Sequence, residues 1–427
     1  PNPIGWPSVA TPSPATTAFT HASDPLSVTL EAMNACATPA RTPNFGNELT
    51  TPTNTRHGGG TFATSIAGGD AVPAVSVPAP VLVTQPVFTN GTTSTAAVIR
   101  WDEVGAFRPT VSLSDYFGAG TVSGTSDWIG RLYPHHFDTV LTPAAGCGGF
   151  AYSGVPGQRG QPFAVQVTAK NGQLPIAGTT QNYNYSATPG LSFARAINLS
   201  EDSMPAVPGS IYVGAAAGGA GAVPDTVFVA GVGTVPATAV VNPSPVSFTY
   251  ATRPAEPQTI TLHAEDADTL PSKATNGGLS GTMLIYSGRL MLGNAFGSEF
   301  AALPVPLQAE RWQSGAWQRN SFDNCTALTV PTSGNGGLAF SPQTGSNQLG
   351  AGETTATMRG TAVSPVTVLS GDSQLRLSAP GSGNQGFVDV IGANLGAPVW
   401  LPPTGNARAC FGICGPRSPV IYSRERY

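Results

Sequence analysis

Apolar and polar residues alternate along many short segments of the chain. The clearest segment runs from Gly288 to Leu328, where Val305, Leu307, Ala309 and Arg311 recur at every second position. Successive side chains of a β-strand point to opposite faces, so this spacing places all four on one side of a strand. The pattern predicts a half-buried strand within this segment.

Turn-forming residues divide the same segment. A strand is expected over 289–292, with turns at 293–294 and 297–298, where Gly is followed by Asn or Ser. Trp312 and Trp317 flank a Ser-Gly pair. This pair predicts that the next strand folds straight back on the preceding one.

A second pattern recurs three times, over 17–34, 148–171 and 246–269. Each copy has a Phe before a turn, a Pro before an alternating strand, and an Ala before a polar turn. These residues are Phe19, Pro25 and Ala32, then Phe150, Pro162 and Ala169, then Phe248, Pro257 and Ala264. Repeats spaced by roughly a hundred residues are typical of immunoglobulin-like sandwiches in tandem. A Pro at the strand start favours an edge strand, where its missing N–H removes no ladder bond.

These patterns predict an all-β protein of tandem immunoglobulin-like β-sandwich domains. We expect a first β-sandwich domain at 1–137, a second at 138–243, and a larger C-terminal β domain at 244–427. Closing strands of the third domain are expected within 374–381, 386–392 and 420–427. We find no convincing segment of ten or more residues with a helical period and both caps.

Composition narrows the functional class. Only 10% of the 427 residues are charged, hydrophobic residues make up 40%, and the net charge is −4. This combination argues against disorder, and the scattered basic residues argue against nucleic-acid binding. No apolar segment predicts a transmembrane helix. The chain begins at Pro1, which we expect to reflect a removed leader or a trimmed product.

Five cysteines are candidates for disulfides: Cys36, Cys147, Cys325, Cys410 and Cys414. None has the spacing of a zinc site, so we favour disulfides formed outside the cytoplasm. The most local candidate is the pair Cys410 and Cys414. An odd count leaves at least one thiol free or paired with another chain, and buried free cysteines are the alternative.

The sequence predicts no catalytic, cofactor-binding or metal-binding residue. Adjacent His135 and His136 should point to opposite faces of a strand, so they cannot easily share a metal ion. The acidic candidates are Asp102, Glu103, Glu299, Asp323 and the run Glu265-Asp266-Ala267-Asp268. Glycoside hydrolysis needs two carboxylates that face each other, and nothing indicates which of these converge. The run could bind calcium, but it lacks EF-hand spacing and we favour a solvated turn.

Tryptophan offers one further candidate. Trp312, Trp317 and Trp400 could form a sugar-stacking face, although aromatic residues also anchor sandwich cores, and we favour the core. A glycan partner is therefore left open without support. No nucleophile elbow, phosphate-binding loop or dinucleotide fingerprint is present, so we expect no enzyme.

Several longer segments resemble MshQ-like proteins, a family associated with biogenesis of the mannose-sensitive haemagglutinin type IV pilus. The resemblance lies in the segment 288–328 and in WDEVG (101–105), IGRLYPHHF (129–137), GQPFAVQVTAKN (160–171), APGSGNQGFVDV (379–390) and RACFGICGPRSPVIYSRERY (408–427). It covers most of the chain from about residue 100 and corresponds to the large C-terminal domain of these proteins, whose function is unknown. The resemblance implies a location at the bacterial cell surface and partners among surface or pilus proteins.

We therefore expect an extracellular structural or adhesive protein that acts with a pilus or similar apparatus. One alternative is a subunit that assembles with copies of itself into a fibre by strand addition. The other is a carbohydrate-binding or carbohydrate-active protein. The ligand, the oligomeric state and the disulfide pairing are not predicted by the sequence.

Overall fold

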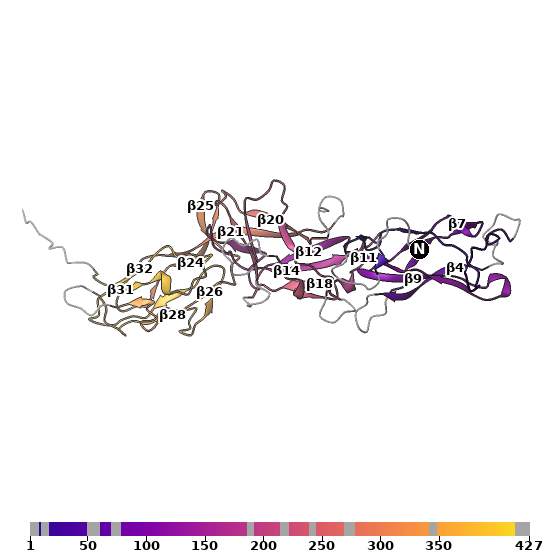
Figure 1. The fold of residues 1–427 in the computed structure, drawn as a ribbon. Helices are drawn as coiled ribbons and strands as arrows, with labels where there is room; N and C mark the ends of the chain where they lie inside the picture. Colours follow the sequence, from indigo (N-terminus) through magenta and orange to yellow (C-terminus); the bar gives the residue numbers. More distant parts are fainter. Residues whose placement is uncertain are drawn as a thin grey trace, which may run out of the picture.

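The computed structural model describes residues 8–9, 17–48, 60–69, 78–185, 192–213, 222–238, 245–268, 278–340 and 348–414. These residues form β-strands joined by loops and four short 3-10 helices. The molecule is elongated, with the first strands near one end and the last near the other (Figure 1). The predicted all-β class is confirmed.

The first region, up to residue 133, contains three sheets. One joins β1 (Ser8–Val9), β2 (Thr20–His21), β4 (Phe62–Gly69), β9 (Gly105–Leu113), β10 (Val122–Thr125) and β11 (Trp128–Tyr133). The second joins β3 (Leu26–Val28), β8 (Ala97–Arg100) and β5 (Val81–Thr84), and the third joins β6 (Val87–Thr89) and β7 (Thr92–Thr95). A 3-10 helix, η1 (Tyr116–Gly118), follows β9. Trp101 and Phe107 stack in the core of this region with centroids 4.6 Å apart.

The middle region has two larger sheets and a strand pair. The first sheet has the order β12 (His136–Thr142), β14 (Ala164–Lys170), β18 (Val232–Val235) and β17 (Phe228–Val229). The second has the order β15 (Asn198–Glu201), β20 (Gln258–Glu265), β21 (Gly281–Leu292), β24 (Leu307–Gln313) and β25 (Ala316–Arg319), and β13 (Phe150–Ser153) pairs with β21. The pair is β16 (Gly209–Val213) with β19 (Val246–Tyr250), and the 3-10 helices are η2 (Gln181–Asn184) and η3 (Asp225–Val227).

One apolar core serves the middle region. The core contains Phe163, which directly precedes β14, and Val165 of β14. From the second sheet it contains Ile260, Leu262 and Ile285. All five side chains are buried. Alternation on β14 and β20 therefore directs one face of each strand into the same core.

The C-terminal region carries a separate core between short strands. Its first sheet has the order β22 (Ala295–Gly297), β32 (Ala407–Phe411), β31 (Gly386–Val390) and β27 (Leu338–Ala339). The others are β23 (Leu303–Pro304), β30 (Leu375–Leu377) and β28 (Ala356–Met358), and the pair β26 (Ala327–Leu328) with β29 (Val366–Thr367). The 3-10 helix η4 (Gly392–Asn394) follows β31.

Strand β21 belongs to both of the last two regions. Its first half pairs with β20 and its second half pairs with β24. Met283 and Ile285 enter the middle core, whereas Leu290 and Leu292 enter the C-terminal core. A 12-residue strand reaches about 40 Å at ordinary strand rise. One continuous strand therefore connects the two cores.

The strand and hairpin predicted around Trp312 are confirmed, whereas Val305 precedes β24 and Gly297, expected in a turn, ends β22. Val305, Leu307 and Ala309 are buried on one face, with Arg311 half-buried beside them. β24 and β25 form the expected hairpin, and its turn residues Ser314 and Gly315 have φ of 53° and 73°. Positive φ at both positions suits the tightest hairpin turns, which explains the Ser-Gly pair.

The edge-strand prediction was correct in one repeat of three. β3 lies at a sheet edge, but β14 and β20 each have a neighbour on both sides. Pro162 and Pro257 lie before the first residue of their strands, so their missing N–H groups remove no ladder bond. The strands expected within 374–381 and 386–392 are present as β30 and β31, and the one within 420–427 lies outside the described residues.

The domain boundaries at 137/138 and 243/244 stay a prediction. A strand runs across the first boundary, and strand pairs connect the two sides of the second. β12 runs through the first boundary without a break. Across the second, β16 pairs with β19 and β15 pairs with β20. The third copy of the repeat thus completes the core that the second copy begins.

Candidate functional site

Buried polar side chains gather at the two junctions between successive regions. We define the first junction as the contact of β11 and residues 102–103 with the middle region. The second is the contact of residues 147–161 with residues 320–326. Within the described residues, no group of three or more His, Cys, Asp or Glu residues could hold a metal ion.

An arginine fixes the first junction. Arg131 of β11 is 3% exposed and donates to both carboxylate oxygens of Asp268, over 2.8 Å and 2.7 Å. Arg195 donates to the same carboxylate over 3.3 Å. Burial raises the pKa of Asp268, but the two arginines outweigh it, so the pKa is lowered overall. The carboxylate is therefore held in its charged form between two cations.

Hydrogen bonds from loops of the middle region hold the two acidic residues of WDEVG. The Glu103 carboxylate accepts hydrogen bonds from the N–H groups of Gln181 and Asn182, over 3.0 Å and 3.1 Å. Burial raises the pKa of Glu103, and these hydrogen bonds oppose that rise without cancelling it. Asn171 donates to the carbonyl of Asp102 over 3.1 Å. Both residues therefore attach the first region to loops of the middle region.

Histidines gather beside this junction. The Nδ1 atoms of His135 and His136 are 3.0 Å apart, and the rings of His21 and His135 have centroids 5.1 Å apart. The expectation that His135 and His136 point to opposite faces was wrong, because His135 lies in the two-residue connector before β12 and not in the strand. Burial lowers the pKa of both, which favours neutral rings.

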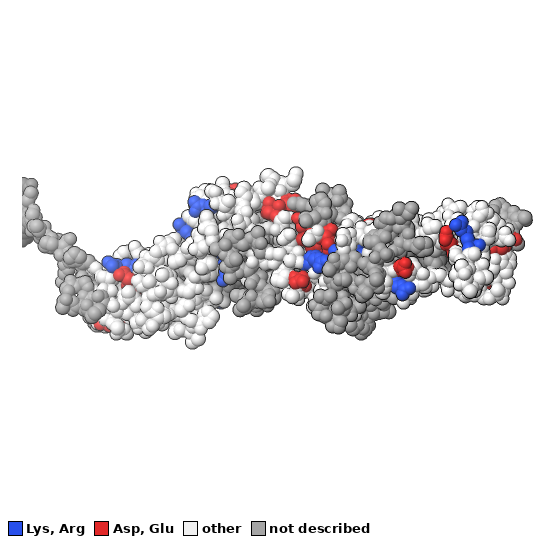
Figure 2. Space-filling view, in the orientation of Figure 1, with Lys and Arg blue, Asp and Glu red and all other residues white. Residues whose placement is uncertain are grey.

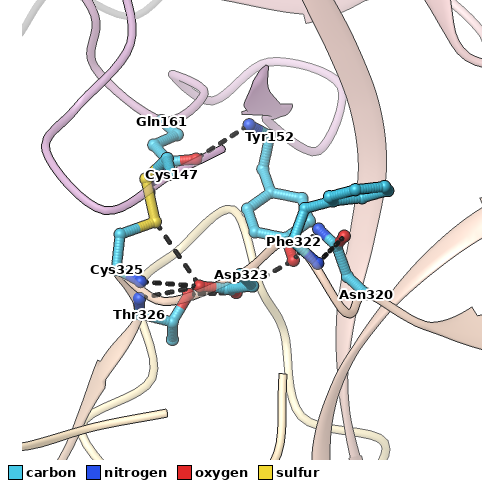
Figure 3. Close-up of a disulfide and its surroundings, with 8 residues drawn as sticks. All are labelled: Cys147, Tyr152, Gln161, Asn320, Phe322, Asp323, Cys325 and Thr326. Atoms are coloured by element: carbon cyan, nitrogen blue, oxygen red, sulfur yellow. Dashed lines mark hydrogen bonds between the residues drawn. A yellow bond between two sulfur atoms is a disulfide. The ribbon is translucent and has the colours of Figure 1, made fainter. Parts of the chain in front are cut away.

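A disulfide fixes the second junction (Figure 3). Cys147 is bonded to Cys325, 178 residues later, with Cα atoms 5.1 Å apart. Gln161 lies over the bond, and its Oε1 accepts the N–H of Tyr152 over 3.0 Å. Backbone bonds between the two segments continue on both sides, from Asn324 N–H to Gly146 O over 3.2 Å and from Gly148 N–H to Phe322 O over 3.3 Å.

A buried carboxylate lies beside the disulfide. Asp323 is fully buried and accepts hydrogen bonds from the Tyr152 hydroxyl (2.9 Å), the Thr326 hydroxyl (2.7 Å) and the N–H groups of Cys325 and Thr326. Asn320 donates to the Tyr152 hydroxyl over 2.7 Å. Burial raises the pKa of Tyr152 well above its ordinary value, and the Asp323 charge adds to this. Tyr152 therefore stays protonated and links the two segments as a donor.

The other candidates are spread over the first region, the β24–β25 hairpin and the C-terminal region. Cys410 and Cys414 form the second disulfide, the local pair that spacing favoured. Cys36 is free and exposed. Glu299 accepts a hydrogen bond from Gln385 over 2.9 Å in the C-terminal region. Trp400 packs against the disulfide cluster, whereas Trp312 and Trp317 contact each other.

Two carboxylates of the run considered for calcium already accept hydrogen bonds from protein side chains. Asp266 is fully buried and accepts the Tyr183 hydroxyl over 2.6 Å, and Asp268 is bound by the two arginines. The expected solvated turn was therefore wrong for these two residues. Sequence reasoning missed Arg131 and Tyr152, although a single Arg within the apolar strand 128–133 was a signal for a buried ion pair.

Comparisons with known proteins identify most of the chain. The third domain of DUF6701 matches residues 103–278, and the fourth matches residues 286–426. The chain contains two DUF6701 domains. No curated protein matches the chain. The fourth-domain match begins at residue 286, inside β21, the strand that both cores share.

The two junctions can be located relative to the DUF6701 domains. The Arg131–Asp268 pair of the first junction lies within the third-domain match, whereas the Cys147–Cys325 bond of the second junction joins the third domain to the fourth. No helix in the described part of the chain is long and apolar enough to cross a membrane. The two disulfides fit a secreted or extracellular protein.

Proposed function

We propose that this chain is a force-bearing spacer of an extracellular surface protein, with no catalytic role. Following the resemblance to MshQ-like proteins, its partners would be a type IV pilus or a similar surface apparatus. The elongated shape and two disulfides support this proposal (Figure 1). Sparse charge over one face of the molecule also suits a presenting stalk (Figure 2).

One observation carries the proposal, namely the position of the Cys147–Cys325 bond. Tension along the backbone would pass from Cys147 through the two sulfur atoms to Cys325. The segment between the two cysteines, which have a sequence separation of 178, would then carry no load until the bond broke. Most of the middle core, including Phe163, Ile260 and Ile285, lies inside this bypassed segment. A covalent bypass is expected in a chain that must stay folded while it is pulled.

We further propose that the regions are immunoglobulin-like sandwiches in tandem. Two features of strand pairing support this. β2 and β13 are the first strands of the first two repeats. β2 pairs in parallel with β11, and β13 pairs in parallel with β21, so each first strand lies beside a strand from near the end of its own region. In both repeats the next strand, β3 or β14, joins a different sheet. Such a change of sheet is the usual way in which one chain builds two packed layers.

Cell-surface location and load bearing can be tested together. Intact host cells are treated with a protease and then exposed to shear flow on a surface to which they attach. We expect the protease to remove the protein, and cells with Cys147→Ser and Cys325→Ser to detach at lower shear with equal protein on the surface. The matched control is Cys410→Ser with Cys414→Ser, which removes a bond with a sequence separation of only 4. Protein that survives the protease, or equal detachment of all strains, would refute the proposal.

A fibre subunit is the second candidate. β10 lies at the end of its sheet, and all four of its side chains are exposed. An exposed edge strand can add a strand from another copy. Sedimentation over a wide range of concentrations would test this, and a chain that stays monomeric throughout would remove the candidate.

A further inference from the structure

One face of the β21–β24–β25 sheet carries an unusual set of side chains. Strand register places Arg289 opposite Glu310, Glu310 opposite Arg319, and Trp312 opposite Trp317. Paired positions share a face, so these five side chains lie on one side of the sheet. The opposite side holds Leu290 and Ala309, which are buried. The face with the two indoles is the outer one.

The two indoles form a half-exposed platform. Trp312 and Trp317 have centroids 5.3 Å apart at an angle of 68°. Arg253, from the loop after β19, places its guanidinium carbon 4.1 Å from the Trp312 ring and 5.2 Å from the Trp317 ring. Arg289 lies 4.5 Å from the Trp317 ring. Two cations therefore stack on one aromatic pair.

The two arginines differ in their remaining contacts. Arg289 donates to Glu310 over 2.6 Å, so its charge is paired. Arg253 is exposed, and within the described part of the chain no acceptor lies within hydrogen-bonding distance of its guanidinium. Stacking orients this guanidinium while its N–H donors stay available. A planar donor group of this kind matches a carboxylate.

The surrounding surface favours an anionic partner. Arg319 adds a third guanidinium to this face, and its nearest carboxylate, on Asp372, is 3.9 Å away. Figure 2 shows basic side chains around the end of the β24–β25 hairpin, with little acidic surface beside them. This basic patch is local, because the whole chain has a net charge of −4.

We propose that this face binds an acidic polysaccharide. The parts of the two indoles that the guanidiniums leave exposed offer apolar surface to the C–H groups of a pyranose ring, and Arg253 and Arg319 receive the carboxylates of uronic acid residues. The indole surface favours a sugar over an acidic peptide, because a pyranose ring of a uronic acid carries apolar C–H groups next to its carboxylate. The proposal does not depend on load bearing. All of these side chains except that of Asp372 lie between Cys147 and Cys325, so a loaded spacer would keep the site folded.

The test uses the full chain and a fluorescent oligogalacturonate, with the fully methyl-esterified oligomer as the uncharged control. We expect saturable binding of the acid and binding of the ester that is at least about tenfold weaker. Arg253→Ala and Trp317→Ala should each weaken binding of the acid by about tenfold. The control variants are Arg408→Ala, whose guanidinium stacks on Phe387 and pairs with Asp389, and Phe296→Ala, an exposed aromatic elsewhere. Both should bind like the wild type.

Three outcomes would overturn the proposal. The first is no saturable binding by the wild type. The second is wild-type affinity in Arg253→Ala, an exposed position whose loss leaves the core intact. The third is equal binding of polyglutamate, which would assign the face to acidic peptides. Thermal unfolding of each variant shows whether it is folded. If Trp317→Ala is unfolded, the affinity of Arg253→Ala alone decides whether the proposal holds. Shear resistance is measured separately, so failure here leaves the spacer proposal untouched.

Discussion

Replacing Cys147 and Cys325 together by serine is expected to destabilise the protein far more than removing the other disulfide. The bond closes a loop with a sequence separation of 178, against 4 for Cys410–Cys414. Loop-closure entropy predicts a loss of about 5 kcal/mol for the long loop and about 2 kcal/mol for the short one. The difference of about 3 kcal/mol comes from loop length alone.

The same bond sets the length released when the chain is pulled. Single molecules are stretched from handles at the two ends, with and without a reductant. At about 3.4 Å for each extended residue, the sequence separation of 178 corresponds to a contour length of about 600 Å. We expect this length to stay hidden in the oxidised protein and to appear after reduction or in the Cys147→Ser, Cys325→Ser variant.

Chemical denaturation gives the free energies, and stretching gives the path of the force. The Cys410→Ser, Cys414→Ser protein is the control for loss of a disulfide as such, and its released length should match that of the oxidised wild type closely. The reasoning would be refuted if the oxidised wild type extended by the full length, or if both double variants lost equal stability.

Three further predictions concern the junctions. Arg131→Ala should destabilise the protein by about 3–5 kcal/mol, measured by urea unfolding, because it leaves the partly buried Asp268 without its bidentate partner; a loss below 1 kcal/mol would contradict this. Tyr152→Phe should cost about 1–3 kcal/mol, because buried Asp323 loses a donor, and Tyr212→Phe on β16 is the control. Folding lowers the pKa of Asp268, so the contribution of this carboxylate to folding stability is present above the ordinary Asp pKa and is lost as pH falls. Folding raises the pKa of Glu103, so the contribution of its protonated form to folding stability is lost as pH rises. Melting temperatures between pH 3 and 7 for Asp268→Asn and Glu103→Gln should therefore deviate from the wild type in opposite directions, and deviations of the same sign would refute the assignment.

Local pattern was sufficient to predict most strands. The alternation of Val305, Leu307 and Ala309 and the Ser-Gly turn after them depend only on side-chain period and turn geometry, and both are present in the structure. The fold class followed from the same features. Partners distant in sequence were not predictable in this way. The pairing of Arg131 with Asp268 spans 137 positions, and no local pattern specifies it.

The repeat was informative about strands and misleading about their neighbours. Copies at Phe150 and Phe248 resemble each other because each begins a strand, a turn and a second strand. Similar local sequences were taken to build separate cores. Their strands instead share one core, since Phe163 and Phe248 pack in the same cluster. Periodicity reports which face of a strand is apolar, but not which other strand covers that face.

The two junctions differ in the chemistry that holds them, and this difference predicts how each fails. The first depends on ionised groups, Asp268 between Arg131 and Arg195, so protonation weakens it. The second depends on a covalent bond and on Tyr152, which stays protonated over the accessible pH range, so reduction weakens it and mild acid does not. β21 adds a continuous strand across the second junction, so reduction should loosen that junction without separating its regions. Acid and reductant should thus act on different parts of the spacer and have nearly additive effects on stability, because the two junctions share no side chain.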